Sequence, residues 1–171
     1  RELATKLINA ESADAFLREP DVAAGWETVS ALKTEVERLI GSDLNAARRL
    51  SERVEEVASA LGDATSKAFA EASRARVLPH IGRYAEADAL YQSAMRGTRD
   101  AKLKTESALI QMHRVVTLTQ MGRYDEALKV SRASRRVLSK GQPVHLAQLE
   151  THVGILFYRR DRYAKSIEHY E

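Results

Sequence analysis

A short motif recurs at a nearly constant interval along the chain, and this repetition restricts the possible folds more than any other feature of the sequence. Three hexapeptides align without gaps: Gly82–Ala87 (GRYAEA), Gly122–Ala127 (GRYDEA) and Asp161–Ser166 (DRYAKS). Their first residues are 40 and 39 positions apart, and a degenerate copy, Ser42–Ala47, begins 40 positions before the first. Periods of this length are typical of solenoids, in which each unit buries its apolar face against its neighbours.

Each part of the motif has a physical role in a helical hairpin. The glycine ends one helix, because glycine adopts the left-handed conformation without a steric cost. The tyrosine two positions later begins the next helix, and the small sixth residue lets two helices approach closely. By the same reasoning Gly97 is predicted to end the helix that follows Gly82.

The rest of the chain favours helices over strands. Glycine and proline are scarce, and no segment alternates apolar and polar residues over the length of a strand. The predicted helices span residues 2–19, 22–40, 43–61, 63–79, 83–96, 100–121, 123–139, 143–160 and 162–171.

The pattern Gly-x-Tyr-x-Glu-Ala between two helices resembles the tetratricopeptide repeat. The resemblance implies an all-α fold, a right-handed superhelical solenoid of helical hairpins. It places the small residue of each first helix at Ala75, Val115 and Gly154. A glycine inside a helix costs about 1 kcal/mol relative to alanine, so close packing is the expected reason for Gly154. The predicted organisation is an N-terminal helical cap, 1–24, followed by repeats at 25–62, 63–99, 100–141 and 142–171, the last of them truncated.

The period exceeds the usual repeat of about 34 residues and resembles a long variant found in large bacterial signalling proteins. One such group carries a caspase-like CHAT protease domain, and another comprises ATP-dependent transcription activators of the maltose-regulator type. Residues 10–20 look more like the CHAT-linked group. The chain begins at Arg1 without a methionine and stops at Glu171 within a helical pattern, so an effector domain is expected outside it.

In this family the first helix of each hairpin lines a concave groove that binds a partner. The resemblance places ten partner-binding residues in that groove: Arg76, His80, Met112, His113, Val116, Gln120, Thr151, His152, Ile155 and Arg159. Such a mixed apolar and basic surface suits an extended peptide or a helix of acidic character. The leading expectation is therefore a scaffold or sensor array that binds a protein or peptide on its concave face.

Other chemistry has little support in the sequence. His113 and His152 occupy equivalent positions and should lie on adjacent helices, but a metal site needs a third ligand that the pattern does not supply. No serine stands in a nucleophile elbow and there is no phosphate-binding loop. No catalytic residue, metal or cofactor is therefore expected. The chain has no cysteine and no run of about 18 apolar residues, which fits a cytoplasmic protein without a membrane span.

Charge is distributed unevenly along the chain. Residues 1–60 contain 8 basic and 12 acidic side chains, whereas residues 61–171 contain 19 basic and 12 acidic ones. Five basic residues are concentrated in one predicted second helix: Lys129, Arg132, Arg135, Arg136 and Lys140. They indicate either a solvated outer face, which we favour, or a contact with an acidic protein or nucleic acid. Nucleic-acid binding by the basic C-terminal portion remains an alternative, disfavoured because no stacking aromatics accompany the charges.

Overall fold

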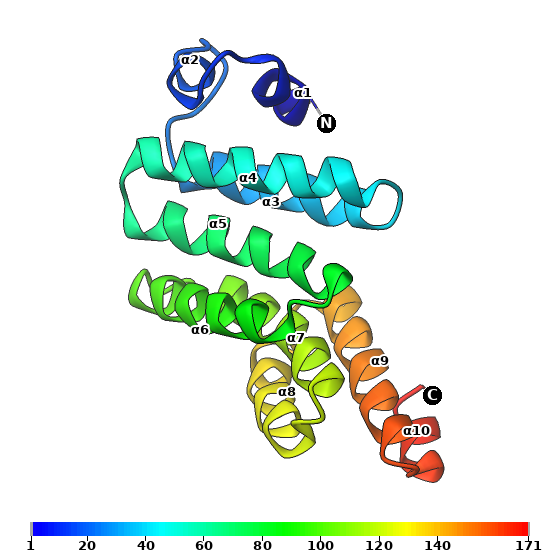
Figure 1. Cartoon of the computed structure of the whole chain (residues 1–171). Helices are drawn as coiled ribbons and strands as arrows, with labels where there is room; N and C mark the ends of the chain where they lie inside the picture. Colours follow the sequence, from blue (N-terminus) through cyan, green and yellow to red (C-terminus); the bar gives the residue numbers. More distant parts are fainter. Residues whose placement is uncertain (1, 171) are drawn as a thin grey trace. The chain divides into compact units, whose positions relative to one another are not determined.

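A computed structural model describes residues 2–170, and all regular structure in this part of the chain is helical (Figure 1). The all-α class predicted from the sequence is thereby confirmed. The helices are α1 (Glu2–Asn9), α2 (Ala13–Leu17), α3 (Trp26–Ile40), α4 (Leu44–Leu61), α5 (Ala64–Val77), the 3-10 helix η1 (Leu78–Ile81), α6 (Tyr84–Asp100), α7 (Lys104–Gln120), α8 (Tyr124–Leu138), α9 (Pro143–Arg159) and α10 (Tyr163–Glu168).

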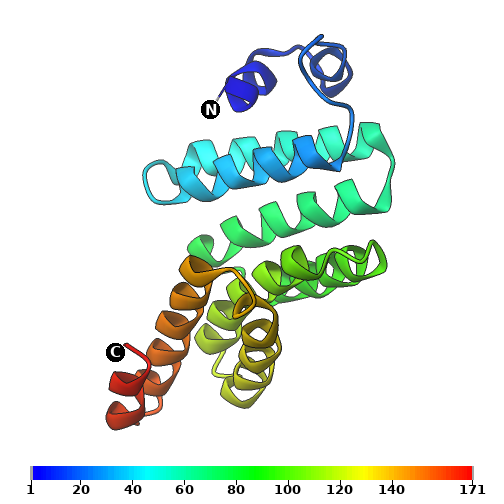
Figure 2. The ribbon, with the colours of Figure 1, turned by 180° about the vertical axis from the view of Figure 1, so that it is seen from behind.

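The chain folds as two compact units, residues 1–101 and residues 102–171. In the first unit α3 pairs with α4 and α5 with α6, and α5 packs against both α3 and α4. In the second unit α7 pairs with α8 and α9 with α10, and α9 packs against both α7 and α8. Both views of the ribbon show these helix pairs (Figures 1 and 2). Within each unit, consecutive helices therefore form hairpins that pack on their sequence neighbours.

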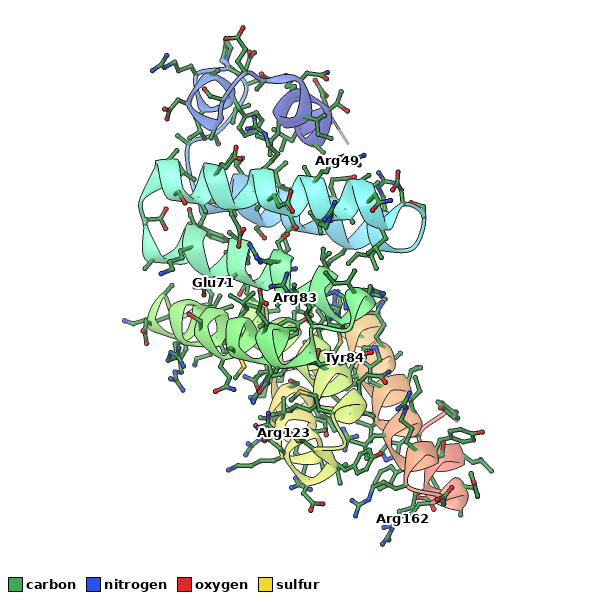
Figure 3. The ribbon with its side chains drawn as sticks, viewed as in Figure 1. Arg49, Glu71, Arg83, Tyr84, Arg123 and Arg162 are labelled. Atoms are coloured by element: carbon green, nitrogen blue, oxygen red, sulfur yellow. The ribbon has the colours of Figure 1, made fainter. Side chains whose placement is uncertain are left out.

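The repeated motif forms the same helix-ending turn three times. Gly82 and Gly122 adopt φ of 78° and 73°, and Asp161 adopts φ of 55° at the equivalent position. The amide of the arginine that follows each of them donates a hydrogen bond to the carbonyl five residues earlier, at 3.1, 2.9 and 3.0 Å. This is the bond that closes a Schellman motif. The three arginines, each directly before the tyrosine that begins α6, α8 or α10, are Arg83, Arg123 and Arg162 (Figure 3).

Gly97 does not end a helix, contrary to the sequence prediction. Helix α6 continues through Gly97 to Asp100, and α7 begins only at Lys104. A Cβ atom added to Gly97 would lie 2.7 Å from the Cβ of Ala68 and 3.3 Å from the carbonyl oxygen of Ala64. The glycine is therefore required where α6 crosses the beginning of α5, because any larger residue would push the two helices apart.

Gly154 has the close contact expected for it. A Cβ atom at this position would lie 2.6 Å from the ring of Tyr170. One repeat earlier, the equivalent residues are Val115 and Ser131, and both are buried. The larger residue of these equivalent pairs is thus Tyr170, just after α10, in one hairpin and Val115, in the first helix, in the other.

The predicted helix 2–19 is interrupted. The hydroxyl of Ser12 accepts a hydrogen bond from the amide of Ala15 at 3.0 Å and thereby caps a new helix, α2. Serine offers its side chain to the backbone in this way more readily than most residues do, so it favours the beginning of a helix over its interior.

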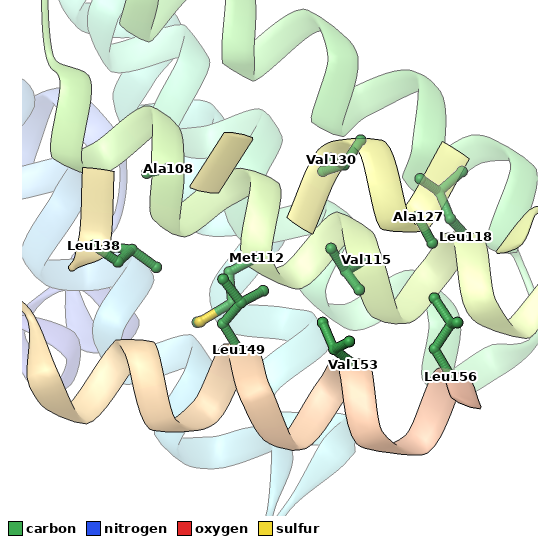
Figure 4. Close-up of a cluster of buried hydrophobic side chains, with 10 residues drawn as sticks. All are labelled: Ala108, Met112, Val115, Leu118, Ala127, Val130, Leu138, Leu149, Val153 and Leu156. Atoms are coloured by element: carbon green, nitrogen blue, oxygen red, sulfur yellow. The ribbon is translucent and has the colours of Figure 1, made fainter. Parts of the chain in front are cut away.

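The core of the first unit contains aromatic side chains, whereas the core cluster of the second unit is aliphatic. In the first unit Trp26, the only tryptophan, stacks on Phe69 of α5 with ring centroids 5.3 Å apart. In the second unit one cluster joins three helices: Ala108, Met112, Val115 and Leu118 of α7, Ala127, Val130 and Leu138 of α8, and Leu149, Val153 and Leu156 of α9 (Figure 4). This cluster fixes the orientation of α9, and with it the surface that α9 presents.

Asp63 caps α5 and supplies a pH-dependent part of the stability. Its carboxylate accepts hydrogen bonds from the amides of Thr65 and Ser66, at 3.0 and 2.8 Å, and from the Ser66 hydroxyl. Partial burial works against the charged form, but these hydrogen bonds outweigh it and hold the pKa of the Asp63 carboxyl below its usual value.

We expect Asp63→Ala to lower the free energy of unfolding by about 1 kcal/mol at neutral pH, because the cap is lost. The folded pKa is depressed, so the part of this difference that depends on the carboxylate charge is fully present above the unfolded pKa of 3.8 and is lost as pH falls through the folded pKa. Urea denaturation at several pH values measures this difference. Asp63→Asn keeps the acceptor without the charge, and a pH dependence identical to that of the wild type in this variant would contradict the assignment.

Candidate partner-binding surface

Helix α9 turns three of the predicted groove residues outward. Leu149, Val153 and Leu156 face the core cluster, whereas Thr151, Ile155 and Arg159 are exposed on the other side of the helix. The spacing of four residues in each step from 151 to 159 keeps these three side chains on one face. The exposed face of α9 therefore offers a polar, an apolar and a basic side chain in a row.

Large apolar side chains extend this face onto α10. Ile155, Tyr158, Tyr163 and Ile167 are 40%, 60%, 53% and 56% exposed. The rings of Tyr158 and Tyr163 meet edge to face with centroids 5.5 Å apart, which joins the end of α9 to the beginning of α10. We call these four residues the α9–α10 apolar surface. Exposed groups of large apolar side chains often mark a contact with a partner.

The equivalent positions one repeat earlier form part of a helix interface. Tyr124 and Leu128, which correspond to Tyr163 and Ile167, are half-buried and pack against the core cluster that α9 completes. Arg160, at the end of α9, lies over the Tyr124 ring at 5.7 Å and is 3.2 Å from Asp125. The same positions that hold α9 on α8 are thus exposed on α10.

The remaining predicted groove residues of the second unit differ in accessibility. Met112 is only 1% exposed and belongs to the core cluster, so the structure places it in the core and not on a partner-binding face. Gln120 is exposed, and Val116 is half-buried. His113 and His152 are half-buried on α7 and α9, which pack together, and the Nδ1 atom of each is enclosed. Among residues 2–170, no cluster of three or more metal-ligating side chains includes them.

In the first unit, Arg76 is engaged by a neighbouring helix. Its Nε atom is 3.7 Å from Oε1 of Glu37 on α3, and the same carboxylate is 2.9 Å from Nζ of Lys33. The buried hydroxyl of Tyr91 lies close to this group, and burial raises the pKa of that phenol to about 12, so it stays neutral. His80 is exposed at the end of the group, and its pKa is lowered by partial burial and by the charge of Arg76. Arg76 therefore stabilises the packing of α3 on α5 as well as offering part of its side chain to solvent.

A pocket of about 720 Å³, which was not predicted from the sequence, lies where α4, α5 and α6 meet. Three carboxylates line it, those of Glu55, Asp63 and Glu71. Glu55 accepts a hydrogen bond from Arg74 at 2.7 Å, and Asp63 caps α5. These acids are therefore part of the helix packing, and we assign no ligand to the pocket.

Comparison with known proteins assigns no family to this arrangement. No protein-family model matches the chain, and no curated protein is significantly similar to it. Within the described part of the chain, no helix combines the length and the apolar composition that crossing a membrane requires.

Proposed function

We propose that this chain is a protein-interaction module that binds a partner on the outward face of α9 and on the α9–α10 apolar surface. The observation that carries the proposal is the exposure of Ile155, Tyr158, Tyr163 and Ile167, with the rings of Tyr158 and Tyr163 in contact. Covering half-exposed side chains of this size contributes on the order of 1 kcal/mol each, which is enough to drive association when a few are covered together.

The chain's own packing suggests the chemistry of the partner. Helix α9 covers Tyr124 and Leu128 with apolar residues at positions i, i+4 and i+7, namely Leu149, Val153 and Leu156. A partner helix with the same spacing would fit the equivalent positions on α10. Arg159 is exposed beside this surface, so an acidic residue at the edge of the partner helix adds a favourable contact.

The resemblance to tetratricopeptide repeats supports a wider proposal. The module is a stacked-hairpin segment of a bacterial signalling protein, and partner binding regulates an effector outside it, such as a CHAT-type protease or an ATP-dependent transcription activator. This wider proposal rests on the repeated motif at Gly82, Gly122 and Asp161 and on its period.

The double variant Ile155→Glu/Ile167→Glu tests the surface. Two buried carboxylates in the interface would be strongly unfavourable, so we expect capture of partners from a lysate of the source cells to fall by about 100-fold or more. The control is Val144→Glu, which also charges an exposed apolar residue of α9, about 16 Å further along the helix. Circular dichroism verifies that both variants fold. Capture of the same proteins by wild type and double variant would refute the proposed surface.

A further inference from the structure

A row of basic side chains runs along the outer face of α8. Lys129, Arg132 and Arg136 are exposed and follow one another at intervals of three and four residues, and Lys140 continues the row in the turn after the helix. At 1.5 Å per residue the row is about 16 Å long. We call these four residues the α8 basic stripe.

In the part of the chain that the structure describes, several basic side chains of the second unit are paired with carboxylates, whereas those of the stripe are not. Arg114 and Arg123 both contact Glu126, and Arg135 contacts Glu150. Among residues 2–170, none of the four side chains of the stripe has a carboxylate as an ion-pair partner. The second unit thus pairs Arg114, Arg123 and Arg135 with carboxylates and leaves the side chains of the stripe facing solvent.

The hairpin fold itself does not require cations at these positions. The equivalent residues 40 positions earlier, on α6, carry a net formal charge of 0: Ala89, Gln92, Arg96 and Asp100. Those 80 positions earlier, on α4, carry a net formal charge of −1: Arg49, Glu52, Glu56 and Ala60. Like charges three or four residues apart destabilise a helix by a few tenths of a kcal/mol per pair. A stripe with four positive charges therefore weakens α8 slightly unless an anionic group binds it.

The neighbouring Arg135 demonstrates how α8 recognises an anion. Its Nε and Nη2 atoms donate hydrogen bonds to the two oxygens of Glu150, at 2.6 and 2.5 Å. Glu150 lies on α9, a helix that packs against α8. This paired geometry suits a planar carboxylate, and two of the four stripe residues are also arginines.

We propose that the α8 basic stripe binds an acidic segment of a partner protein, with carboxylates spaced three or four residues apart along a helix. This spacing matches the single row on α8 over three helical turns. Nucleic acid fits less well, because single-strand sites combine positive charge with stacking aromatic side chains, and the stripe contains only lysine and arginine. The stripe lies on a different helix from the α9–α10 apolar surface, so it constitutes a second contact beyond the proposed function.

Fluorescence anisotropy with defined probes tests this proposal. The probe is a labelled alanine-based helical peptide of about 18 residues, with glutamates at positions i, i+4, i+7 and i+11. We expect it to bind the wild-type chain at about 50 mM salt and to be released as salt rises to about 300 mM, since the contact is exposed and ionic. Arg132→Glu/Arg136→Glu should weaken binding at least about 10-fold.

The matched control is Arg96→Glu/Arg99→Glu, which reverses the same number of exposed charges on α6 and should change binding less than about two-fold. Equal loss in both variants would mean that net charge alone attracts the peptide, and would overturn the proposal. So would failure of the wild type to bind at low salt, or tighter binding of a single-stranded or duplex DNA probe that the stripe variant also abolishes. None of these results bears on the α9–α10 apolar surface, whose test uses different residues.

Discussion

Gly97→Val is expected to lower the free energy of unfolding of the first unit by about 3 kcal/mol, at the upper end of the usual cost of overpacking. Even the first atom of a side chain would lie 2.7 Å from the Cβ of Ala68. Both atoms are attached directly to helix backbones, so neither can rotate away. The contact can be relieved only by separating α6 from α5. This cost exceeds the gain of several tenths of a kcal/mol that valine offers over glycine in a helix.

Trp26 makes this loss directly measurable. Its ring stacks on Phe69, the residue next to Ala68 in α5, so tryptophan fluorescence during urea denaturation reports on the packing that Gly97→Val disturbs. Gly41→Val is the control. Gly41 adopts a right-handed φ of −78° at the end of α3, and no atom lies within 4 Å of an added Cβ. It should change stability by no more than about 0.5 kcal/mol, and an equal loss in both variants would contradict the packing role.

The turns of the fold could be predicted from the sequence because their cause is local. At Gly82 and Gly122 a left-handed glycine, a following arginine and a helix-starting tyrosine are all adjacent in the chain. The Schellman hydrogen bond that closes each turn spans only five residues. Three consecutive residues therefore indicate the geometry, and the motif is sufficient to recognise it.

Gly97 could not be assigned in the same way, because two different requirements select glycine. A glycine that ends a helix and a glycine that admits a neighbouring helix look alike in a single sequence. Only the position of Ala68, which is 29 residues away, distinguishes them. The prediction chose the local explanation, whereas packing between helices determines the result.

The sequence predicts which helix face forms the candidate surface, but not which of its side chains are exposed to solvent. Successive residues of a helix are rotated by about 100°, so the repeat register selects a face only approximately. Met112 and Ile155 were both placed on the groove face, yet Met112 is in the core and Ile155 is exposed. Which apolar residues are covered depends on the next helix, and for that reason the exposure of Tyr158 and Tyr163 was not predicted.

The ion pair between Arg76 and Glu37 could have been predicted from the repeat period. Glu37 and Arg76 are 39 positions apart, so they occupy equivalent places on the first helices of successive hairpins. Residues at equivalent positions face each other when those helices stack. Opposite charges one period apart therefore predict an ion pair, such as the one found between α3 and α5.

Leu149→Ala is expected to lower the free energy of unfolding by about 3 kcal/mol, because it leaves a cavity between α9 and the rest of the second unit. Leu149 is fully buried and lies beside Met112 in the core cluster (Figure 4). Far-ultraviolet circular dichroism during urea denaturation measures the loss, since Trp26 is in the first unit. Val144→Ala, on the same helix but two-thirds exposed, is the control and should cost less than about 0.5 kcal/mol.

A double-mutant cycle that combines Leu149→Ala with Met112→Ala then tests whether Met112 belongs to the core or to the predicted groove face. Neighbouring core residues share the cavity that each truncation creates, so the effects of the two substitutions should deviate from additivity by about 0.5 kcal/mol or more. A residue on an accessible groove face would be independent of Leu149, and its truncation would cost little. Additive effects of the two substitutions would therefore contradict the placement of Met112 in the core. A coupling energy would show that α9, with the proposed partner-binding face it presents, is held in place by packing between Met112 and Leu149.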